Sequence, residues 1–144
     1  MSVFSFILLL SVASVNAQFR RIPADVTDSF KAKYESASGV SWKDRLSSFQ
    51  ADFTMGDKEM KALFTSKGEW IKTETHHSYT NLPADVKDGF KKSKYADLEV
   101  LTVTQIEDKD NQTQYRIVVK KNTFNKRSLI FSRAGQLIGD NASL

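Results

Sequence analysis

The sequence predicts an α+β protein of two tandem units, each one helix followed by a four-stranded antiparallel sheet. The first observation is a repeat: residues 22–31 return as residues 82–91, at a shift of 60 and with seven of the ten positions identical. The second observation is a change of pattern within each copy. Apolar residues first recur at helical spacing and then alternate with polar residues, as they do in strands. Such identity within one chain indicates a duplicated unit. We expect a signal peptide at 1–17, a first repeat at 18–79 and a second repeat at 80–144.

Each copy of the repeated segment opens with a helix. Pro23 and Pro83 suit the first helical position, where a missing N–H costs nothing and the fixed φ already fits. Asp25 and Asp85 follow in the first turn, where the positive end of the helix dipole stabilises carboxylates. Apolar residues spaced by four then give each helix one apolar stripe: Ile22, Val26 and Phe30, and Leu82, Val86 and Phe90.

Strands are predicted after the first helix, where apolar and polar residues alternate. An antiparallel pair is expected at 40–43 and 49–54, and Gly56 turns the chain into a third strand at 60–65. A fourth strand is expected at 70–75, with no assignment of its inward side. The residues expected to face the core are Phe49, Ala51, Phe53, Met60, Ala62 and Phe64.

The second unit is expected to repeat this plan with a longer first hairpin. Tyr115, Ile117 and Val119 correspond to Phe49, Ala51 and Phe53 at a shift of 66. The additional residues are placed in the polar stretch 107–113. An insertion before Tyr95 would turn this residue to the far side of a continuous helix, so the second helix should end or bulge near Ser93.

The N-terminal residues have the pattern of an export signal. An apolar run at 3–13 is too short to span a bilayer, and Val15-Asn16-Ala17 provides small residues where a signal peptidase would cut. Cleavage is expected before Gln18, which gives a periplasmic or secreted protein. No other stretch is apolar enough to cross a membrane, so no membrane contact is expected after cleavage.

Composition narrows the class of function. The chain of 144 residues is 40% hydrophobic and 26% charged, as in folded globular proteins. Its net charge of +4 is small and dispersed, so nucleic acid is not expected as a partner. Cysteine is absent, which excludes a disulfide, a thiol nucleophile and a thiolate metal site. Export without cysteine favours a protein of a bacterial envelope.

The residues that could carry chemistry have simpler explanations. His76 and His77 would point to opposite faces of a strand, so they do not readily bind one metal ion. The aspartate pairs at 25/28 and 85/88 could suggest acid–base catalysis, but helix starts explain them. No catalytic triad or phosphate-binding loop is present. We therefore predict no enzyme, no catalytic residues, no metal and no cofactor.

Several motifs together resemble a known family. Residues 23–34 read Pro-Ala-x-Val-x-x-x-Phe-Lys-x-Lys-Tyr, followed by Val-x-Trp at Val40, Phe-x-Ala-x-Phe at Phe49 and Phe-x-x-x-Gly-x-Trp at Phe64. With the signal peptide, they resemble the PepSY-like, beta-lactamase-inhibitor-like proteins of the Bacteroidetes envelope. The resemblance implies tandem units of a helix on a four-stranded sheet. It also implies a non-catalytic protein that binds or inhibits another.

The sheet face away from the helices is the candidate binding surface. Mixed charges with a few apolar groups suit a protein-binding patch, and the alternative is an ordinary solvated face. We expect a non-catalytic protein-binding or inhibitor-like module whose partner is another envelope protein or peptide. A periplasmic ligand sensor or buffer, and a small hydrolase using the histidines, are the other candidates. The predicted binding residues are Gln50, Asp52, Lys61, Leu63, Arg116, Val118 and Lys120.

Overall fold

The computed structural model describes residues 21–143, so the predicted signal peptide lies outside the described residues. The chain forms one sheet of eight antiparallel strands whose order in the sheet follows their order in the chain. The strands are β1 (Ser38–Asp44), β2 (Ser48–Met55), β3 (Lys58–Thr65), β4 (Trp70–His77), β5 (Glu99–Asp108), β6 (Thr113–Asn122), β7 (Asn125–Ser132) and β8 (Leu137–Ser143).

The prediction of two tandem units, each with its own four-stranded sheet, is wrong. β4 pairs with β5 along the pairs from Lys72↔Asp108 to His77↔Val103, so the backbone ladder continues across the predicted boundary. β4 and β5, which would have been edge strands of two separate sheets, pair with each other in this way, and only β1 and β8 remain at the edges of the sheet that the structure describes. The result is a single eight-stranded sheet with two helices.

The helices α1 (Ala24–Lys33) and α2 (Ala84–Lys92) begin directly after Pro23 and Pro83. The carbonyl oxygen of Pro83 accepts a hydrogen bond from Lys87 N at 3.1 Å, so this proline starts the helical ladder without needing an N–H of its own. A short 3₁₀ turn, η1 (Tyr79–Asn81), connects β4 to α2. α2 ends at Lys92 with Ser93 as its C-cap, which confirms the predicted end.

Each helix covers its own group of buried side chains. Under α1, Phe30 lies edge-on to Phe53 with ring centroids 5.0 Å apart. Under α2, Phe90 lies edge-on to Phe131 at 6.3 Å. The strand residues predicted to face the core are buried or, for Met60, half-buried. The two groups share no residue.

The N-terminal turn of each helix rests on a glycine turn of the sheet. Gly68 and Gly135 both have φ of +80°, and a Cβ at either would overlap the carbonyl oxygen of Asp25 or Asp85, respectively. α2 approaches more closely still, because a Cβ at Gly89 would overlap the carbonyl oxygen of Gly135. A glycine that weakens an isolated helix is therefore required here for contact between helix and sheet.

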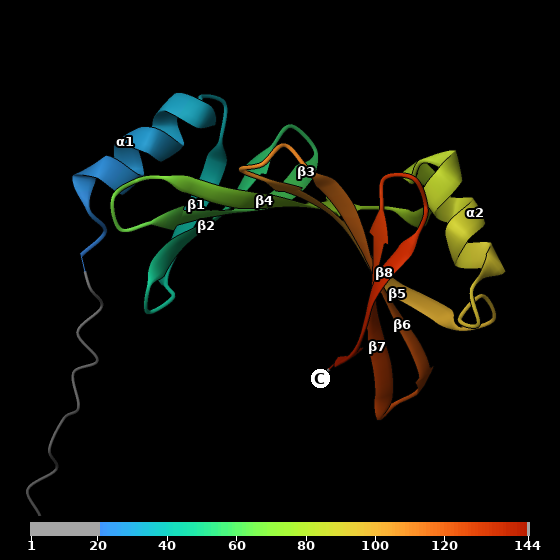
Figure 1. The fold of residues 1–144 in the computed structure, drawn as a ribbon. Helices are drawn as coiled ribbons and strands as arrows, with labels where there is room; N and C mark the ends of the chain where they lie inside the picture. Colours follow the sequence, from blue (N-terminus) through green and yellow to red (C-terminus); the bar gives the residue numbers. More distant parts are fainter. Residues whose placement is uncertain (1–20, 144) are drawn as a thin grey trace, which may run out of the picture.

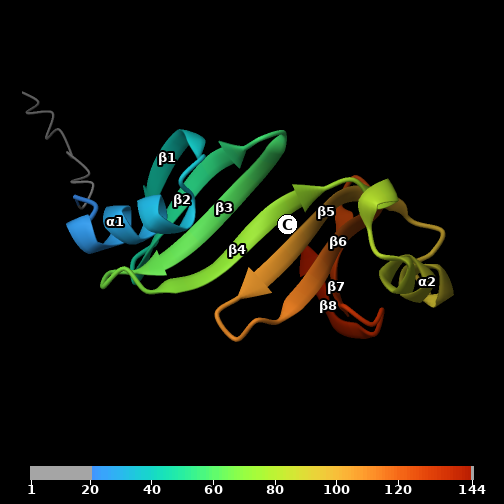
Figure 2. The ribbon, with the colours of Figure 1, turned by 90° about the horizontal axis from the view of Figure 1, so that it is seen from above.

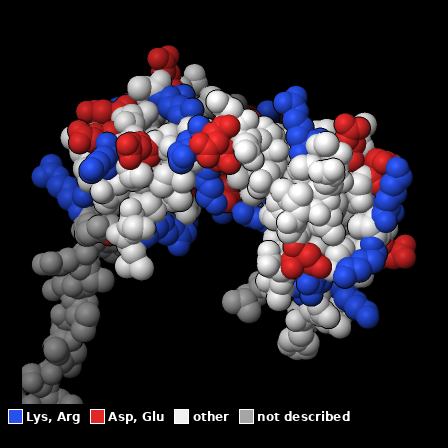
Figure 3. Space-filling model, viewed as in Figure 1, with Lys and Arg blue, Asp and Glu red and all other residues white. Residues whose placement is uncertain are grey.

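The sheet twists and curves into an arch. α1 lies on the outer side over the strands of the first half, and α2 lies on the outer side beside β5–β8 (Figure 1). Seen from above, each helix covers its own end of the sheet, while β4 and β5 between them carry no helix (Figure 2). The space-filling view shows the hollow on the inner side of the arch (Figure 3). The face opposite the helices, called the open face below, is therefore concave.

Candidate functional site

The alternation of side chains along each strand determines which residues lie on the open face. Because Phe49, Ala51 and Phe53 point toward α1, the residues between them point to the opposite side. The same alternation applies on β3 and β6, where the predicted binding residues are half-buried, except for Lys61, which is exposed. All seven predicted residues lie on the open face: Gln50, Asp52, Lys61, Leu63, Arg116, Val118 and Lys120.

These residues form two groups rather than one patch. Gln50 is directly opposite Leu63, and Asp52 is directly opposite Lys61, so these four lie together on β2 and β3. The residues of β6 are separated from them by β4 and β5. Lys120, near the end of β6, forms an ion pair of 3.2 Å with Glu99. The sequence placed the residues on the correct face but did not reveal this separation.

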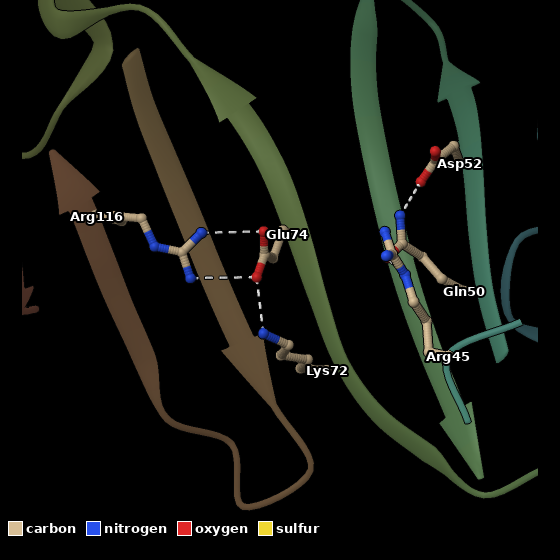
Figure 4. Close-up of polar contacts among 6 residues, drawn as sticks. All are labelled: Arg45, Gln50, Asp52, Lys72, Glu74 and Arg116. Atoms are coloured by element: carbon tan, nitrogen blue, oxygen red, sulfur yellow. Dashed lines mark hydrogen bonds and ion pairs between the residues drawn. The ribbon is translucent and has the colours of Figure 1, made fainter. Parts of the chain in front are cut away.

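Glu74, which sequence reasoning missed, lies between the two groups: it is directly opposite Lys61 on β3 and is bonded by Arg116 on β6. Arg116 donates to Glu74 through both terminal nitrogens, at 3.1 and 3.3 Å, across the intervening strand β5. Lys72 donates to the same carboxylate at 2.7 Å. Figure 4 shows both cations converging on Glu74. A fork of two charge-assisted bonds fixes the position of the guanidinium group as well as its charge.

A second polar group surrounds Asp52. Lys43 and Gln50 both donate to the Asp52 carboxylate, and Arg45 donates to the Gln50 side-chain oxygen at 3.0 Å. These residues come from β1, β2 and the turn between them. Figure 4 shows Arg45, Gln50 and Asp52 of this group. Every polar side chain of this group is thus held by another, which gives the face a defined arrangement before any partner binds.

Both carboxylates are stabilised in the ionised form. Burial raises the pKa of Glu74, but the hydrogen bonds from Arg116 and Lys72 lower it by more, so the pKa lies below its ordinary value. Burial also opposes ionisation of Asp52, and the hydrogen bonds from Lys43 and Gln50 outweigh it, so this pKa is lowered as well. Neither carboxylate is suited to serve as a general acid near neutral pH.

Two depressions, of about 390 and about 460 Å³, open on this face. Lys61 and Glu74 line both of them. The first depression also contains Asp52 and Glu59, whereas the second contains Arg45 and Lys72. The charged groups beside the shared pair are therefore acidic in one depression and basic in the other.

The two histidines do not act together. His76 is exposed and lines the first depression, whereas His77 pairs with Val103 and lies on the helix side. Burial lowers the pKa of His77, with the charge of Lys58 acting in the same direction. Among residues 21–143, no cluster of three or more side chains is arranged to hold a metal ion. No described helix has the length and apolar character of a membrane span.

Solved structures from Bacteroides share this fold. A DUF2874 family protein from Bacteroides uniformis is 28% identical, with a TM-score of 0.80 over 83% of this chain and 88% of that chain. A BLIP-like protein from Bacteroides fragilis is 25% identical, with a TM-score of 0.79 over 87% of this chain and 89% of that chain. A protein from Bacteroides eggerthii, provisionally described as periplasmic, is 27% identical, with a TM-score of 0.80 over 85% of this chain and 89% of that chain.

Comparison with curated proteins finds no match. The family model described as beta-lactamase-inhibitor-like, PepSY-like matches residues 47–139. These residues extend from the start of β2 into β8, and they include β4, β5 and the pairing between them. The match therefore covers both halves of the arch. The chain belongs to the PepSY-like, beta-lactamase-inhibitor-like family.

Proposed function

We propose that the chain is a non-catalytic binding module whose open face docks on another protein of the bacterial envelope. The observation that carries the proposal is the bridge from Arg116 to Glu74, which fixes a charged pair on the concave surface between the predicted residues of β2 and β3 and those of β6. A preorganised polar surface loses little conformational freedom on binding, which favours recognition of a folded partner.

The composition of the face supports a protein partner. Leu63 and Val118 supply apolar contact area between the charged groups, and a mixture of apolar and charged side chains is typical of interfaces between separately folded proteins. The concave shape would accept a convex segment such as a loop or a helix. The lowered pKa values of Asp52 and Glu74 favour fixed negative charges rather than proton transfer.

The charge pattern also suggests how a partner would be oriented. A basic group would be favoured beside Asp52 and Glu59 in the first depression, and an acidic group beside Arg45 and Lys72 in the second. A partner segment with a basic group at one end and an acidic group at the other could bind in one orientation. In the reverse orientation, like charges would repel it. This arrangement gives specificity more than affinity.

The proposed setting is the periplasm or the exterior of the cell. The pattern of the first 17 residues, with an expected cut before Gln18, supports export. The Bacteroides eggerthii relative, provisionally described as periplasmic, supports the same setting. We also propose that the helix segments at 22–31 and 82–91 are traces of an internal duplication.

The test compares capture of envelope proteins by wild type and by Lys61→Glu. Lys61 is exposed and lines both depressions, so reversal of its charge should weaken capture without changing the fold. The matched control is Lys91→Glu, a similar reversal at an exposed position on α2. Arg116→Glu is a poorer test because it would leave Glu74 without its main partner.

Loss of one specific partner with Lys61→Glu and its retention with Lys91→Glu would support the open face. Equal capture by all three proteins would reject it. Capture that weakens only with Lys91→Glu would move the interface to the helix side.

A further inference from the structure

The hairpin of β6 and β7 projects beyond its neighbours. β5 begins at Glu99, which pairs with Lys120, and Ser143, the last residue of β8 that the structure describes, pairs with Lys126. The chain continues past both neighbours to the pair Asn122↔Asn125. Residues 121–125 form the tip of this hairpin, which points downward in Figure 1, away from the helices.

Phe124 occupies this tip and is 98% exposed. Its ring contributes nothing to either group of buried side chains. Tight hairpin turns ordinarily carry asparagine, aspartate or glycine, so the turn itself gives no reason for a phenyl ring. Phenylalanine is among the residue types most often buried, and here the whole ring faces solvent at the end of the hairpin.

Positive charge surrounds the tip. Residues 120–127 contain four cations and no acid: Lys120, Lys121, Lys126 and Arg127. Glu99 neutralises Lys120 and Asp140 neutralises Arg127, at 3.2 and 2.5 Å. Lys121 and Lys126 form no ion pair with any residue that the structure describes. Blue side chains gather near this tip in Figure 3.

Part of this charge is unfavourable for the hairpin. Lys120 and Lys126 lie directly opposite each other, and like charges in such pairs destabilise a hairpin. Glu99 relieves the repulsion from one side only. An apolar tip between repelling lysines is poorly explained by folding and well explained by an anionic, partly apolar partner.

We propose that the tip of the β6–β7 hairpin docks on an anionic phospholipid surface, with Phe124 in the interfacial region and Lys121 and Lys126 near the phosphate groups. An apolar side chain such as phenylalanine enters the boundary between headgroups and acyl chains, and lysines beside it add electrostatic attraction to anionic lipids. This differs from the sequence-based expectation of no membrane contact after cleavage. It does not depend on the proposed function of the open face.

A lipid surface fits the tip better than a protein pocket. The tip presents one exposed ring and two lysines, and its Asn122 side chain is occupied within the turn by the Phe124 N–H, whereas the open face shows charged side chains fixed around Glu74. A fluid surface needs apolar insertion and charge but no matching shape. Contact through one hairpin would hold the protein reversibly and leave the concave face accessible.

The experiment measures cosedimentation of the chain beginning at Gln18, which contains every described residue but not the apolar run at 3–13. One set of vesicles contains equal parts of phosphatidylglycerol and phosphatidylcholine, and the other contains phosphatidylcholine alone. Wild type should bind the anionic vesicles, and added salt should weaken binding. Phe124→Ser should reduce the binding constant roughly ten-fold. Lys121→Glu with Lys126→Glu should abolish the preference for anionic vesicles.

Leu46→Ser is the matched control, because Leu46 is 91% exposed at another hairpin turn, beside the opposite charges of Asp44 and Arg45. Its binding should equal that of wild type, and circular dichroism should show all variants folded. Equal binding of wild type and Phe124→Ser, or no binding of wild type to anionic vesicles, overturns the proposal. A protein captured through Phe124 without vesicle binding would also overturn it, in favour of protein docking.

Discussion

Arg116 on β6 reaches over β5 and donates two hydrogen bonds to the carboxylate of Glu74 on β4. The two side chains retain 29% and 18% of their exposure, so the pair is largely removed from water. Removing one partner leaves the other partly buried and without its counter-charge, which costs more than losing both.

Arg116→Met should lower the free energy of unfolding by about 1–2 kcal/mol, and Arg116→Met combined with Glu74→Gln should cost less than the sum of the two single changes. Urea unfolding of the three variants and wild type measures this coupling. The control is Asp110→Asn, which removes a surface ion pair with Lys109 and should have no measurable effect. Strictly additive effects of Arg116→Met and Glu74→Gln would contradict the coupling.

The lowered pKa values of Asp52 and Glu74 predict how the free energy of unfolding changes at acid pH. Asp52 and Glu74 have pKa values below the ordinary 3.8 and 4.5, respectively, so the folded chain binds their protons less readily than the unfolded chain. Their contribution to stability is present above the ordinary values and is lost as pH falls through the lowered ones. Glu74→Gln should be less stable than wild type near neutral pH, and the difference should shrink in acid. A difference that grows as pH falls would contradict the sign.

Gly89→Ala should destabilise the chain although alanine is the better helix former. The new methyl group would overlap the carbonyl oxygen of Gly135, so α2 would have to move off the turn. We expect a loss of about 1–3 kcal/mol, as for overpacking in a core. Thermal unfolding measures it, with Ser29→Ala at the corresponding position of α1 as the control, which should be neutral or slightly stabilising. A gain in stability with Gly89→Ala would contradict the close packing.

Leu46→Asn should stabilise the chain. Leu46 has a φ of +63°, a left-handed conformation that is costly for leucine and better tolerated by asparagine. Because the leucine side chain is 91% exposed, little burial is lost, and we expect a gain of about 0.5–1 kcal/mol in the free energy of unfolding. Thr123→Asn, at a turn residue without positive φ, should give no gain under the same urea titration. An equal gain in both variants would point to a general effect of asparagine in turns.

Alternation made much of the open face predictable. A strand residue has only two directions, so burial of Phe49, Ala51 and Phe53 fixes the outward direction of Gln50 and Asp52. The inward side of β4 could not be assigned from apolar alternation, because the buried residue on that side is polar. Thr73 is 3% exposed and is bonded by the Tyr34 hydroxyl and, at 2.9 Å, by Trp70 Nε1. Hydrogen bonds rather than apolar character make this burial possible, and periodicity does not detect them.

The missed pairing has a similar cause. The fourth strand was predicted to end at 75, yet His76 and His77 extend β4 and pair with Thr104 and Val103. The pairing uses main-chain groups, which every residue carries, so side-chain patterns did not reveal it. Glu74 was missed for the same reason, since its partner on β6 is adjacent only after β4 and β5 have paired.

The separation of the two groups of buried side chains has a mechanical consequence. Because the group under α1 shares no residue with the group under α2, neither group holds the two halves of the arch together across the β4–β5 junction. The stiffness of this junction then depends on its backbone ladder and on the fork between Arg116 and Glu74. This ladder and this fork together therefore set the width of the concave side.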